Sequence, residues 1–349
     1  MNIVYGVSGE GLGHVFEAIQ VIGRLRAEGH AVKVLTYGDR ACDTLAPFAP
    51  TRIEGITLAF TARGMSVPAT VRANLGCLPF FLGHWGRLRR ELEAFRPDVF
   101  ITAYEPFTMV AAHVLRRPLV SMDNQNELLH QPRPTGAPWL EFRLVQLATL
   151  VATHGAAAYV IKSYRKAVPS TRRYRFVSPL IQLETQGMRP TEGEHVLVYL
   201  TKPNPALLAV LRALPGRFIV YCHDRTGTEG NLEFRAHGAT FLPDLASARA
   251  IIGTTGFSLI ADAIFLGKPY FGVPLRRQFE QVYNARFLAR SGFGDYSESP
   301  TREQLAGFLG DLPRYRSQLR GRALDPQEQE ATLLAVLEEL RQRPSPPVV

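Results

Sequence analysis

The chain has 349 residues, of which 46% are hydrophobic and 20% are charged. This composition excludes a mostly disordered chain, and the length is enough for two domains. The formal net charge is +9, and residues 1–180 account for +8 of it, with 21 basic and 13 acidic side chains. Such a basic half predicts an anionic partner: a phosphate-bearing acceptor, an acidic membrane surface or nucleic acid. Because 35 of the 40 basic residues are arginine, compositional bias is the alternative explanation.

The first half of the chain alternates short apolar runs with helical patterns. Strands are predicted at Ile3–Val7, Ala31–Tyr37, Val99–Thr102 and Leu119–Met122. Strands that alternate with helices in this way predict a doubly wound parallel sheet of the α/β class. There is no apolar run of about 18 residues or more and no secretory signal pattern at the start. We therefore expect a cytoplasmic protein.

The same alternation begins again after a linker predicted over Pro179–Glu194. Strands are predicted at His195–Leu200, Phe218–Tyr221, Thr240–Leu242, Ala250–Ile252 and Tyr270–Val273, and helices at Pro205–Leu214 and Ser258–Leu266. We therefore predict a first domain over residues 1–180, a second over 195–325, and a C-terminal helix and tail over 326–349. Two such Rossmann-like sheets would face a central cleft, with ligands at the carboxyl ends of the strands.

The turn after the first strand reads Gly9-Glu10-Gly11-Leu12-Gly13-His14. Gly11 and Gly13 permit a tight turn with close approach of a ligand, and the amides of the following helix can face an anion. The spacing differs from G-x-G-x-x-G because His14 stands at the third position. Neutral histidine accepts a proton near pH 7, so His14 is a candidate catalytic base. A histidine that only closes the turn is the alternative.

A second candidate site lies at Ile251–Ser258, where a buried strand ends and a helix begins. The hydroxyls of Thr254, Thr255 and Ser258, with the helix amides after Gly256, form a predicted anion site that needs no lysine and no metal. No Gly-Lys-Ser/Thr sequence follows, so this is not a Walker loop. An ordinary capped helix is the alternative.

Polar residues beyond this turn are suited to binding a sugar nucleotide. Asp262 follows Ser258 by four residues and shares its helix face, where its carboxylate can accept hydrogen bonds from ribose hydroxyls. Glu280 and Gln281 follow the next predicted strand and offer adjacent acceptors and donors for sugar hydroxyls.

These residues resemble the GT-B glycosyltransferases of families one and twenty-eight. The most specific part is Gly253–Gly292, with Gly-x-x-Gly, an acid, Gly-Lys-Pro, Pro, Gln-x-Glu-Gln-x-x-Asn-Ala and Gly in the family's spacing. The chain is most similar to small bacterial and archaeal members with a Gly-Glu-Gly-Leu-Gly-His turn. It is more distantly similar to the N-acetylglucosaminyltransferase of peptidoglycan synthesis.

The resemblance implies an inverting, metal-independent hexosyltransferase. The donor would be a nucleotide diphosphate sugar, most simply a UDP-sugar, and the acceptor a hydroxyl compound, lipid-linked or anionic, held by the basic half. No resident cofactor is expected, and the sequence has no Asp-x-Asp triplet for a metal. The implied roles are the following: Gly11 and Gly13 near the diphosphate and acceptor, His14 as base, Thr255 and Gly256 at the diphosphate, Asp262 (usually Glu in the family) at the ribose, and Glu280 and Gln281 at the transferred sugar.

One departure concerns the acid that orients the histidine in many relatives. Ala103 stands where they have aspartate. Glu105, two residues on, and Asp123, at the end of the next predicted strand, are both candidates for that role. The sequence does not choose between them.

Two further interpretations follow from weaker signals. Leu75–Arg90 is apolar and then basic, which predicts a peripheral contact with an anionic membrane, although such a helix more often packs on its own domain. The alternative activities are a nucleotide-sugar hydrolase or epimerase of the same fold. More remote is a nucleic-acid-binding protein, because no basic recognition helix or RNA-binding aromatic motif is present.

Overall fold

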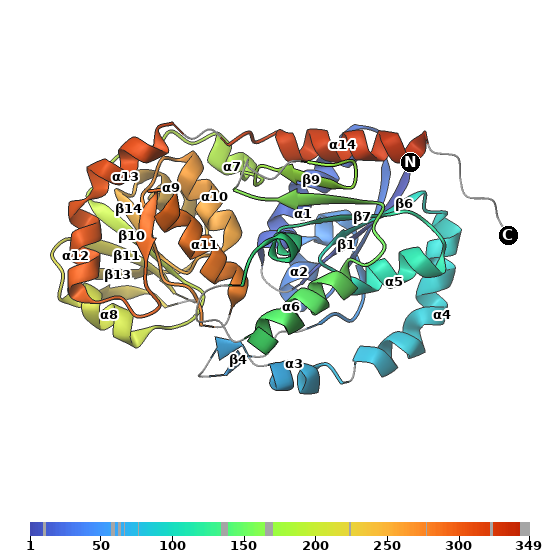
Figure 1. The fold of residues 1–349 in the computed structure, drawn as a ribbon, viewed down its shortest axis with the longest axis horizontal. Helices are drawn as coiled ribbons and strands as arrows, with labels where there is room; N and C mark the ends of the chain where they lie inside the picture. Colours follow the sequence, from blue (N-terminus) through green and yellow to red (C-terminus); the bar gives the residue numbers. More distant parts are fainter. Residues whose placement is uncertain are drawn as a thin grey trace. The chain divides into compact units, whose positions relative to one another are not determined.

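The computed structural model describes residues 1–9, 12–56, 60–61, 64–65, 67–75, 77–133, 139–164, 170–222, 225–276, 278–321 and 324–342. The chain divides into two compact units. The first unit joins Met1–Leu180 with Pro326–Val349, and the second is Ile181–Asp325. The chain therefore leaves the first unit, builds the second and returns to the first, as the colours of Figure 1 show.

A seven-stranded sheet in the order β3-β2-β1-β6-β7-β8-β9 forms the centre of the first unit. Every neighbouring pair in it is parallel. Its strands are β1 (Asn2–Val7), β2 (Ala31–Thr36), β3 (Thr51–Arg52), β6 (Val99–Ala103), β7 (Leu119–Asp123), β8 (Ala158–Lys162) and β9 (Tyr174–Val177). β4 (Phe60–Thr61) and β5 (Gly64–Met65) form a separate hairpin. All residues of β6, β7 and β8 are buried, as expected for strands that are covered on both faces.

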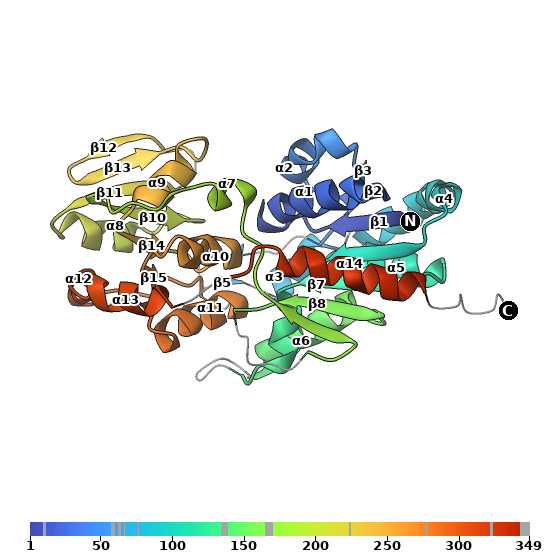
Figure 2. The same ribbon diagram turned by 90° about the horizontal axis from the view of Figure 1, so that it is seen from above.

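Helices cover both faces of this sheet (Figure 2). The described helices of this unit are α1 (Leu12–Ala27), α2 (Asp39–Thr44), η1 (Ala46–Phe48), α3 (Val67–Ala73), α4 (Cys77–Phe95), α5 (Pro106–Val114), η2 (Gln125–His130), α6 (Trp139–Ala152) and α14 (Glu328–Arg341). On one face Ile22 of α1 and Leu337 of α14 pack against Tyr5 of β1. On the other face Leu92 of α4 packs against Val4 of β1. Alternate residues of one strand thus serve two cores.

The second unit has its own seven-stranded sheet, in the order β12-β13-β11-β10-β14-β15-β16. Its strands are β10 (His195–Leu200), β11 (Arg217–Cys222), β12 (Gly227–Glu229), β13 (Leu232–Arg235), β14 (Ala250–Gly253), β15 (Tyr270–Gly272) and β16 (Gly294–Tyr296). Only the edge pair β12–β13 is antiparallel among the described pairs. Its helices are α7 (Leu183–Gln186), α8 (Pro205–Arg212), α9 (Phe241–Ser247), α10 (Phe257–Phe265), α11 (Phe279–Arg290), α12 (Arg302–Gly310) and α13 (Leu312–Leu319).

The predicted α/β architecture with two parallel sheets is confirmed, with one wrong element. Thr240–Leu242, predicted as a strand, contains the start of helix α9, and the strand beside β11 is Leu232–Arg235 instead. Pro243 stands in the first turn of α9, where a missing N–H costs no helical hydrogen bond. None of the helices in the described ranges is both long and apolar enough to cross a bilayer.

Two glycines bring backbone close to neighbouring elements and so shape the carboxyl edges of the sheets. A Cβ on Gly6 of β1 would lie 1.7 Å from Thr108 Oγ1 of α5. A Cβ on Gly272 of β15 would lie 2.6 Å from Thr255 Cγ2, in the turn before α10. Each glycine therefore lets the start of a helix approach its strand. A larger residue at either position would push that helix start away.

Candidate functional site

His14 lies in the first turn of α1, directly beyond the carboxyl end of β1, and is half-buried. Its Nε2 is 3.1 Å from Nε2 of Gln125, the first residue of η2 beyond β7. Its Nδ1 is buried and has no hydrogen-bond partner in the described part of the chain. An amide can present either its NH2 or its oxygen to the ring, so Gln125 is compatible with either neutral tautomer.

The surroundings of His14 favour its neutral form. Burial, and then the positive charge of Lys162 at the end of β8, lower the pKa of His14 to about 3. Lys162 itself is buried and forms an ion pair with Glu17, which follows His14 by three residues on α1. A neutral imidazole at pH 7 is able to accept a proton.

Glu105, one of the two candidate orienting acids, is the N-cap of α5. Its carboxylate accepts hydrogen bonds from the amides of Phe107 (2.9 Å) and Thr108 (2.7 Å) and from the Thr108 hydroxyl (2.6 Å). The group is fully buried, and this burial raises its pKa while the three hydrogen bonds oppose the rise. Its hydrogen bonds within the described residues therefore go to its own helix.

Asp123, the other candidate, ends β7 and closes the turn into η2. Its Oδ1 accepts from the Asn126 amide (2.7 Å), and its Oδ2 accepts from the Ser121 hydroxyl (2.6 Å) and the Asn126 side chain (2.7 Å). Burial raises its pKa against these bonds and the charge of Lys162. Neither acid has a described hydrogen bond to His14, and the side chain that does is Gln125.

The first-unit residues that sequence reasoning missed are Gln125, Lys162 and Glu17. Gln125 lies two residues after Asp123, and the sequence assigned it no role. Lys162 ends β8, a strand that was not predicted. The sequence signal that could identify Glu17 is its spacing of three residues from His14, which places both side chains on one helix face. Gly13 is exposed on the first turn of α1, while Gly11 lies outside the described residues.

In the second unit, the candidate anion site is the start of α10. Gly256 is the N-cap, and no side chain caps the amides of the first turn. Gly256 and Ser258 are half-exposed. Uncapped amides and the positive end of the helix dipole together favour an anion at this position.

Thr254 and Thr255 form the scaffold of this turn. Both are buried. The Thr255 hydroxyl donates to the Gln281 carbonyl of α11 (2.8 Å), and Asn284 of α11 donates its side-chain amide to the Thr255 carbonyl (2.9 Å). The Thr254 carbonyl accepts from the Tyr270 hydroxyl (2.6 Å). The start of α10 is thus fixed to α11 and β15.

Glu280 and Gln281 open α11 and differ in accessibility. Gln281 is buried, and its Oε1 accepts from the Leu275 amide (2.9 Å), which shapes the loop after β15. Glu280 is half-exposed in the first turn. Of this pair, only Glu280 presents its side chain to the surface.

Asp262 is buried in the second turn of α10, with 2% of its surface exposed. Gln182 donates its side-chain amide to Oδ2 (3.3 Å). Burial raises the pKa of Asp262 to about 7. Oδ1 has no hydrogen-bond partner among the described residues. A ribose would therefore have to displace the segment that carries Gln182 to reach this carboxyl group.

An aromatic cluster lies beside this turn and was not predicted. The exposed ring of His237 stacks on Phe241, with 4.5 Å between centroids, and both rings contact Tyr199 of β10 and Tyr221 of β11. The Tyr199 carbonyl accepts from the Thr254 amide (3.0 Å), so the cluster adjoins the start of α10. Burial lowers the pKa of His237, which favours a neutral, stackable ring. His223 and Asp224, which follow β11 in the sequence, lie outside the described residues.

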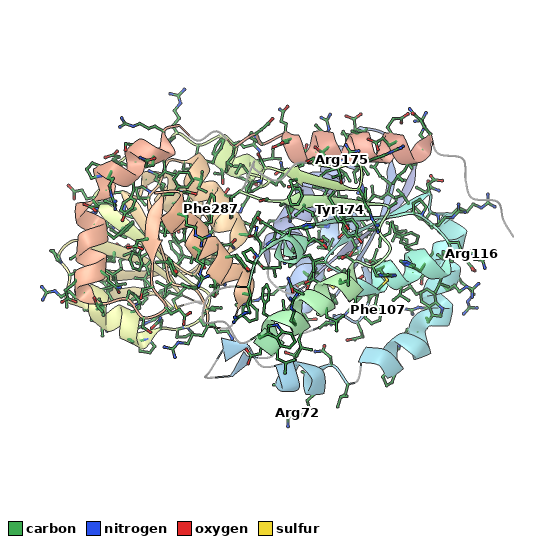
Figure 3. The ribbon with its side chains drawn as sticks, in the orientation of Figure 1. Arg72, Phe107, Arg116, Tyr174, Arg175 and Phe287 are labelled. Atoms are coloured by element: carbon green, nitrogen blue, oxygen red, sulfur yellow. The ribbon has the colours of Figure 1, made fainter. Side chains whose placement is uncertain are left out.

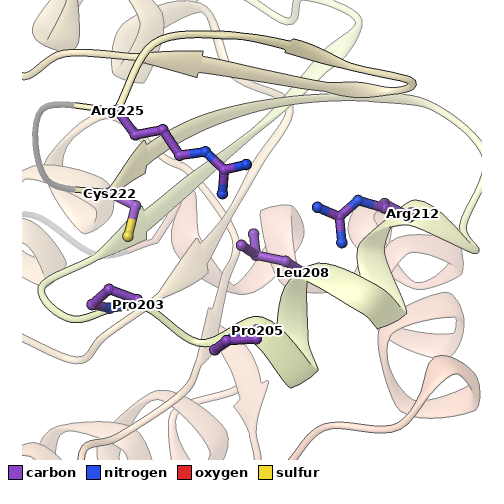
Figure 4. A pocket seen from close by; sticks show the side chains of 6 residues that line it. All are labelled: Pro203, Pro205, Leu208, Arg212, Cys222 and Arg225. Carbon is purple, nitrogen blue, oxygen red and sulfur yellow. The ribbon is translucent and has the colours of Figure 1, made fainter.

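A separate pocket of about 260 Å³ lies beside α8 in the second unit (Figure 4). It is lined by Pro203, Pro205, Leu208, Arg212, Cys222 and Arg225. Arg212 and Arg225 extend across it in Figure 4, and both pair with Glu229. The single carboxylate of Glu229 therefore balances one of the two positive charges, and none of the predicted site residues lines this pocket.

Comparison with known proteins shows similarity over most of the chain. A family model described as "Glycosyl transferase family 1" matches residues 1–313. A protein of Methanosarcina acetivorans described as an uncharacterized glycosyltransferase is 23% identical over 335 residues, covering 86% of this chain and 87% of its own length.

Solved structures show the same fold at low identity. The glycosyltransferase of kitacinnamycin has a TM-score of 0.67 at 20% identity and covers 98% of this chain and 99% of its own. The spinosyn rhamnosyltransferase SpnG, solved with thymidine diphosphate, has a TM-score of 0.59 at 17% identity and covers 97% and 100%. At these identities the likeness concerns the fold alone.

Proposed function

Because this chain belongs to glycosyl transferase family 1 and has the GT-B fold, we propose that it is an inverting glycosyltransferase that uses a nucleoside diphosphate sugar. That the chain is a glycosyltransferase follows from its family. The donor class, the inversion, the independence of metal and the acceptor class are parts of the proposal.

The uncapped start of α10 carries the proposal for the donor. Thr255 and Asn284 hold this helix start rigidly, while Gly256 and Ser258 remain accessible. A diphosphate placed there meets backbone amides and a helix dipole, which stabilise the charge that grows on the leaving group. The relative SpnG was solved with thymidine diphosphate, which supports this donor class.

Two neighbouring features extend the donor site. The exposed His237 ring, stacked on Phe241, offers a flat surface for the nucleobase. Glu280, half-exposed at the start of α11, offers carboxylate oxygens for the hydroxyls of the transferred sugar. Asp262 keeps its proposed ribose role only if the nucleotide displaces Gln182.

His14 is proposed as the catalytic base. The acceptor oxygen attacks the anomeric carbon, the bond from that carbon to the diphosphate oxygen breaks, and the hydroxyl proton passes to His14. A single displacement inverts the anomeric centre. The negative charge of a bound donor raises the pKa of a nearby imidazole, which offsets the effect of burial and of Lys162.

The acceptor is proposed to be a lipid-linked or anionic hydroxyl compound, as the basic first unit suggests. The described part of Leu75–Arg90 favours packing over membrane contact, because Leu88 is buried and Trp85 packs against the same core. Helix α6 instead exposes six large apolar side chains, 37–61% accessible: Trp139, Leu140, Leu144, Leu147, Leu150 and Val151. With the exposed Arg143 on the same helix and net charge +8 over residues 1–180, this face supports peripheral contact with an anionic bilayer.

The proposal is tested first by finding the donor. A thermal-shift screen against nucleoside diphosphates and their sugars should identify a stabilising nucleotide, and calorimetry should give its affinity. Incubation of that donor with hydroxyl acceptors is then followed by mass spectrometry. A glycosylated product with inverted anomeric configuration, unaffected by EDTA, is the expected result.

The same assay separates the alternatives. A hydrolase releases free sugar at full rate without acceptor, and an epimerase converts the donor into its epimer, whereas a transferase shows only slow leakage. Steeply salt-dependent binding of DNA or RNA would favour the nucleic-acid alternative.

A further inference from the structure

A buried ion pair lies behind the start of α1 and takes no part in the bond changes proposed above. Glu17 of α1 pairs with Lys162 of β8, and their side chains are 10% and 3% exposed. Gln329 of α14, fully buried, also donates to Glu17. A pair of this kind seldom stabilises a fold more than apolar side chains of the same size, because both charges lose their water. Stabilisation of the fold therefore does not explain why this pair lies next to a candidate base.

Geometry connects this pair to His14. Glu17 follows His14 by three residues, so both lie on the same side of α1. Lys162 ends β8, next to Asp123 at the end of β7, and its charge acts on both His14 and Asp123. The directed ion pair adds a constraint on the rotation of α1 to the one that the apolar face of this helix already imposes.

We propose that Lys162 is a positioning residue for His14: paired with Glu17 and backed by Gln329 of α14, it fixes the first turn of α1 and keeps a positive charge near the imidazole. This inference rests on the proposed role of His14 as base. Its consequence is a base that stays unprotonated in the resting protein and takes a proton only when an anionic donor is bound.

The groups that face this part of α1 come from six elements. They are Glu17 on α1 itself, Lys162 on β8, Asp123 on β7, the neutral amide of Gln125 on η2 and the neutral amide of Gln329 on α14. The hydroxyl of Tyr5 on β1 is also buried nearby, since the charge of Glu17 raises the pKa of Tyr5 after the effect of burial. Lys162 is the only cation among these named groups.

The main test replaces both charges at once, because removing one would leave the other buried and unpaired. In Glu17→Gln/Lys162→Met, the NMR titration midpoint of His14, assigned by comparison with His14→Ala, should move upward. The kcat for transfer should fall about tenfold while the donor KM stays within twofold, as expected for a displaced base. Lys162→Arg, which keeps the charge, should retain the wild-type midpoint.

The matched control removes a different ion pair, which joins the sheet to α14. Arg175 of β9, labelled in Figure 3 beneath this helix, pairs with Glu339 (2.8 Å). Arg175→Met/Glu339→Gln should leave the His14 midpoint and kcat unchanged. Gln329→Leu is a milder variant, suitable if the double variant does not fold, and should lower kcat a few-fold at constant KM.

The outcomes distinguish this inference from the proposed function. An unchanged midpoint and an unchanged kcat in the folded double variant, or an unchanged kcat in Gln329→Leu where only that variant folds, overturn the role of Lys162. Full transfer by His14→Ala overturns the role of His14 as base, whereas the midpoint reports the influence of Lys162 without any turnover.

Discussion

The side-chain amide of Gln125 lies 3.1 Å from Nε2 of His14, although 111 residues separate them in the chain. A neutral amide thus contacts the proposed base, while the nearby carboxylates of Glu105 and Asp123 bind the starts of their own following helices. The ring is oriented without being made strongly basic. The first two predictions follow from this arrangement.

Replacement of His14 should remove transfer and leave the donor site intact. We expect His14→Ala to lower kcat by about 10²–10⁴, the range for loss of a general base. The affinity for the nucleoside diphosphate, measured by calorimetry, should change less than twofold. Transfer at the original rate would show that another group takes the proton.

Exchange of the amide for a carboxylate should strengthen the base. In Gln125→Glu a negative charge next to the ring favours the imidazolium, so the pKa of His14 should rise from about 3. NMR titration of the ring measures this directly. Gln125→Leu is the control: it removes the contact without adding charge, and should lower kcat with no upward movement of the midpoint.

A negative charge at the start of α10 should compete with the donor. We expect Ser258→Asp to weaken binding of the nucleoside diphosphate about tenfold or more, because like charges at this helix start repel. The fold should tolerate it, since an acid in the first turn of a helix is favourable. Ser258→Ala, the neutral control, should bind within about threefold of wild type. Equal binding by the Asp and Ala variants would place the diphosphate elsewhere.

Asp262 should make the stability depend on pH. Its pKa is about 7 in the folded protein against an ordinary value of 3.8, so the folded state keeps a proton that the unfolded state releases. Stability should therefore fall as pH rises from about 4 to 7 and then level off. Asp262→Asn should remove this fall and raise the free energy of unfolding at pH 8 by up to about 4 kcal/mol.

Denaturant unfolding at pH 4 and pH 8 measures this difference. Asp295→Asn, at an exposed aspartate, is the control and should shift both values equally. A gain of the same size at both pH values in Asp262→Asn would contradict the assignment of the effect to titration.

The exposed face of α6 should govern membrane contact. Leu144→Glu/Leu147→Glu places two charges on this face without touching the buried Phe142 and Thr149. We expect wild-type protein to float with vesicles of phosphatidylglycerol but not of phosphatidylcholine, and the variant to lose flotation with unchanged Tm. Equal flotation of both proteins would remove α6 from the proposal.

Regular buried strands were predictable from the sequence alone. His195–Leu200 was predicted with its observed bounds. The run His-Val-Leu-Val-Tyr-Leu, after a glycine-containing linker, is typical of a buried strand. Leu232–Arg235 was missed, since its alternation of apolar and charged residues covers only four positions. Thr240–Leu242 was misread because three apolar or β-branched residues do not separate a strand from a helix start.

The site was predictable where the chemistry is local and less so where it depends on packing. The helix start at Gly256 follows from its glycine and hydroxyl residues. The burial of Thr255 and Gln281 depends on the docking of α11, and the burial of Asp262 depends on the segment that carries Gln182, so neither can be derived from spacing. The contact between Gln125 and His14 depends on strand order, which brings the ends of β1 and β7 to one edge.

The return of α14 to the first unit makes the second unit an insertion within the first. Leu333 and Leu337 of this helix complete the core built by residues 1–180. A chimaera that exchanges the second unit between relatives therefore needs two junctions, near Leu180 and near Pro326. A single cut at the first junction would import a foreign terminal helix, with no glutamine guaranteed opposite Glu17 and no matched surface for the sheet.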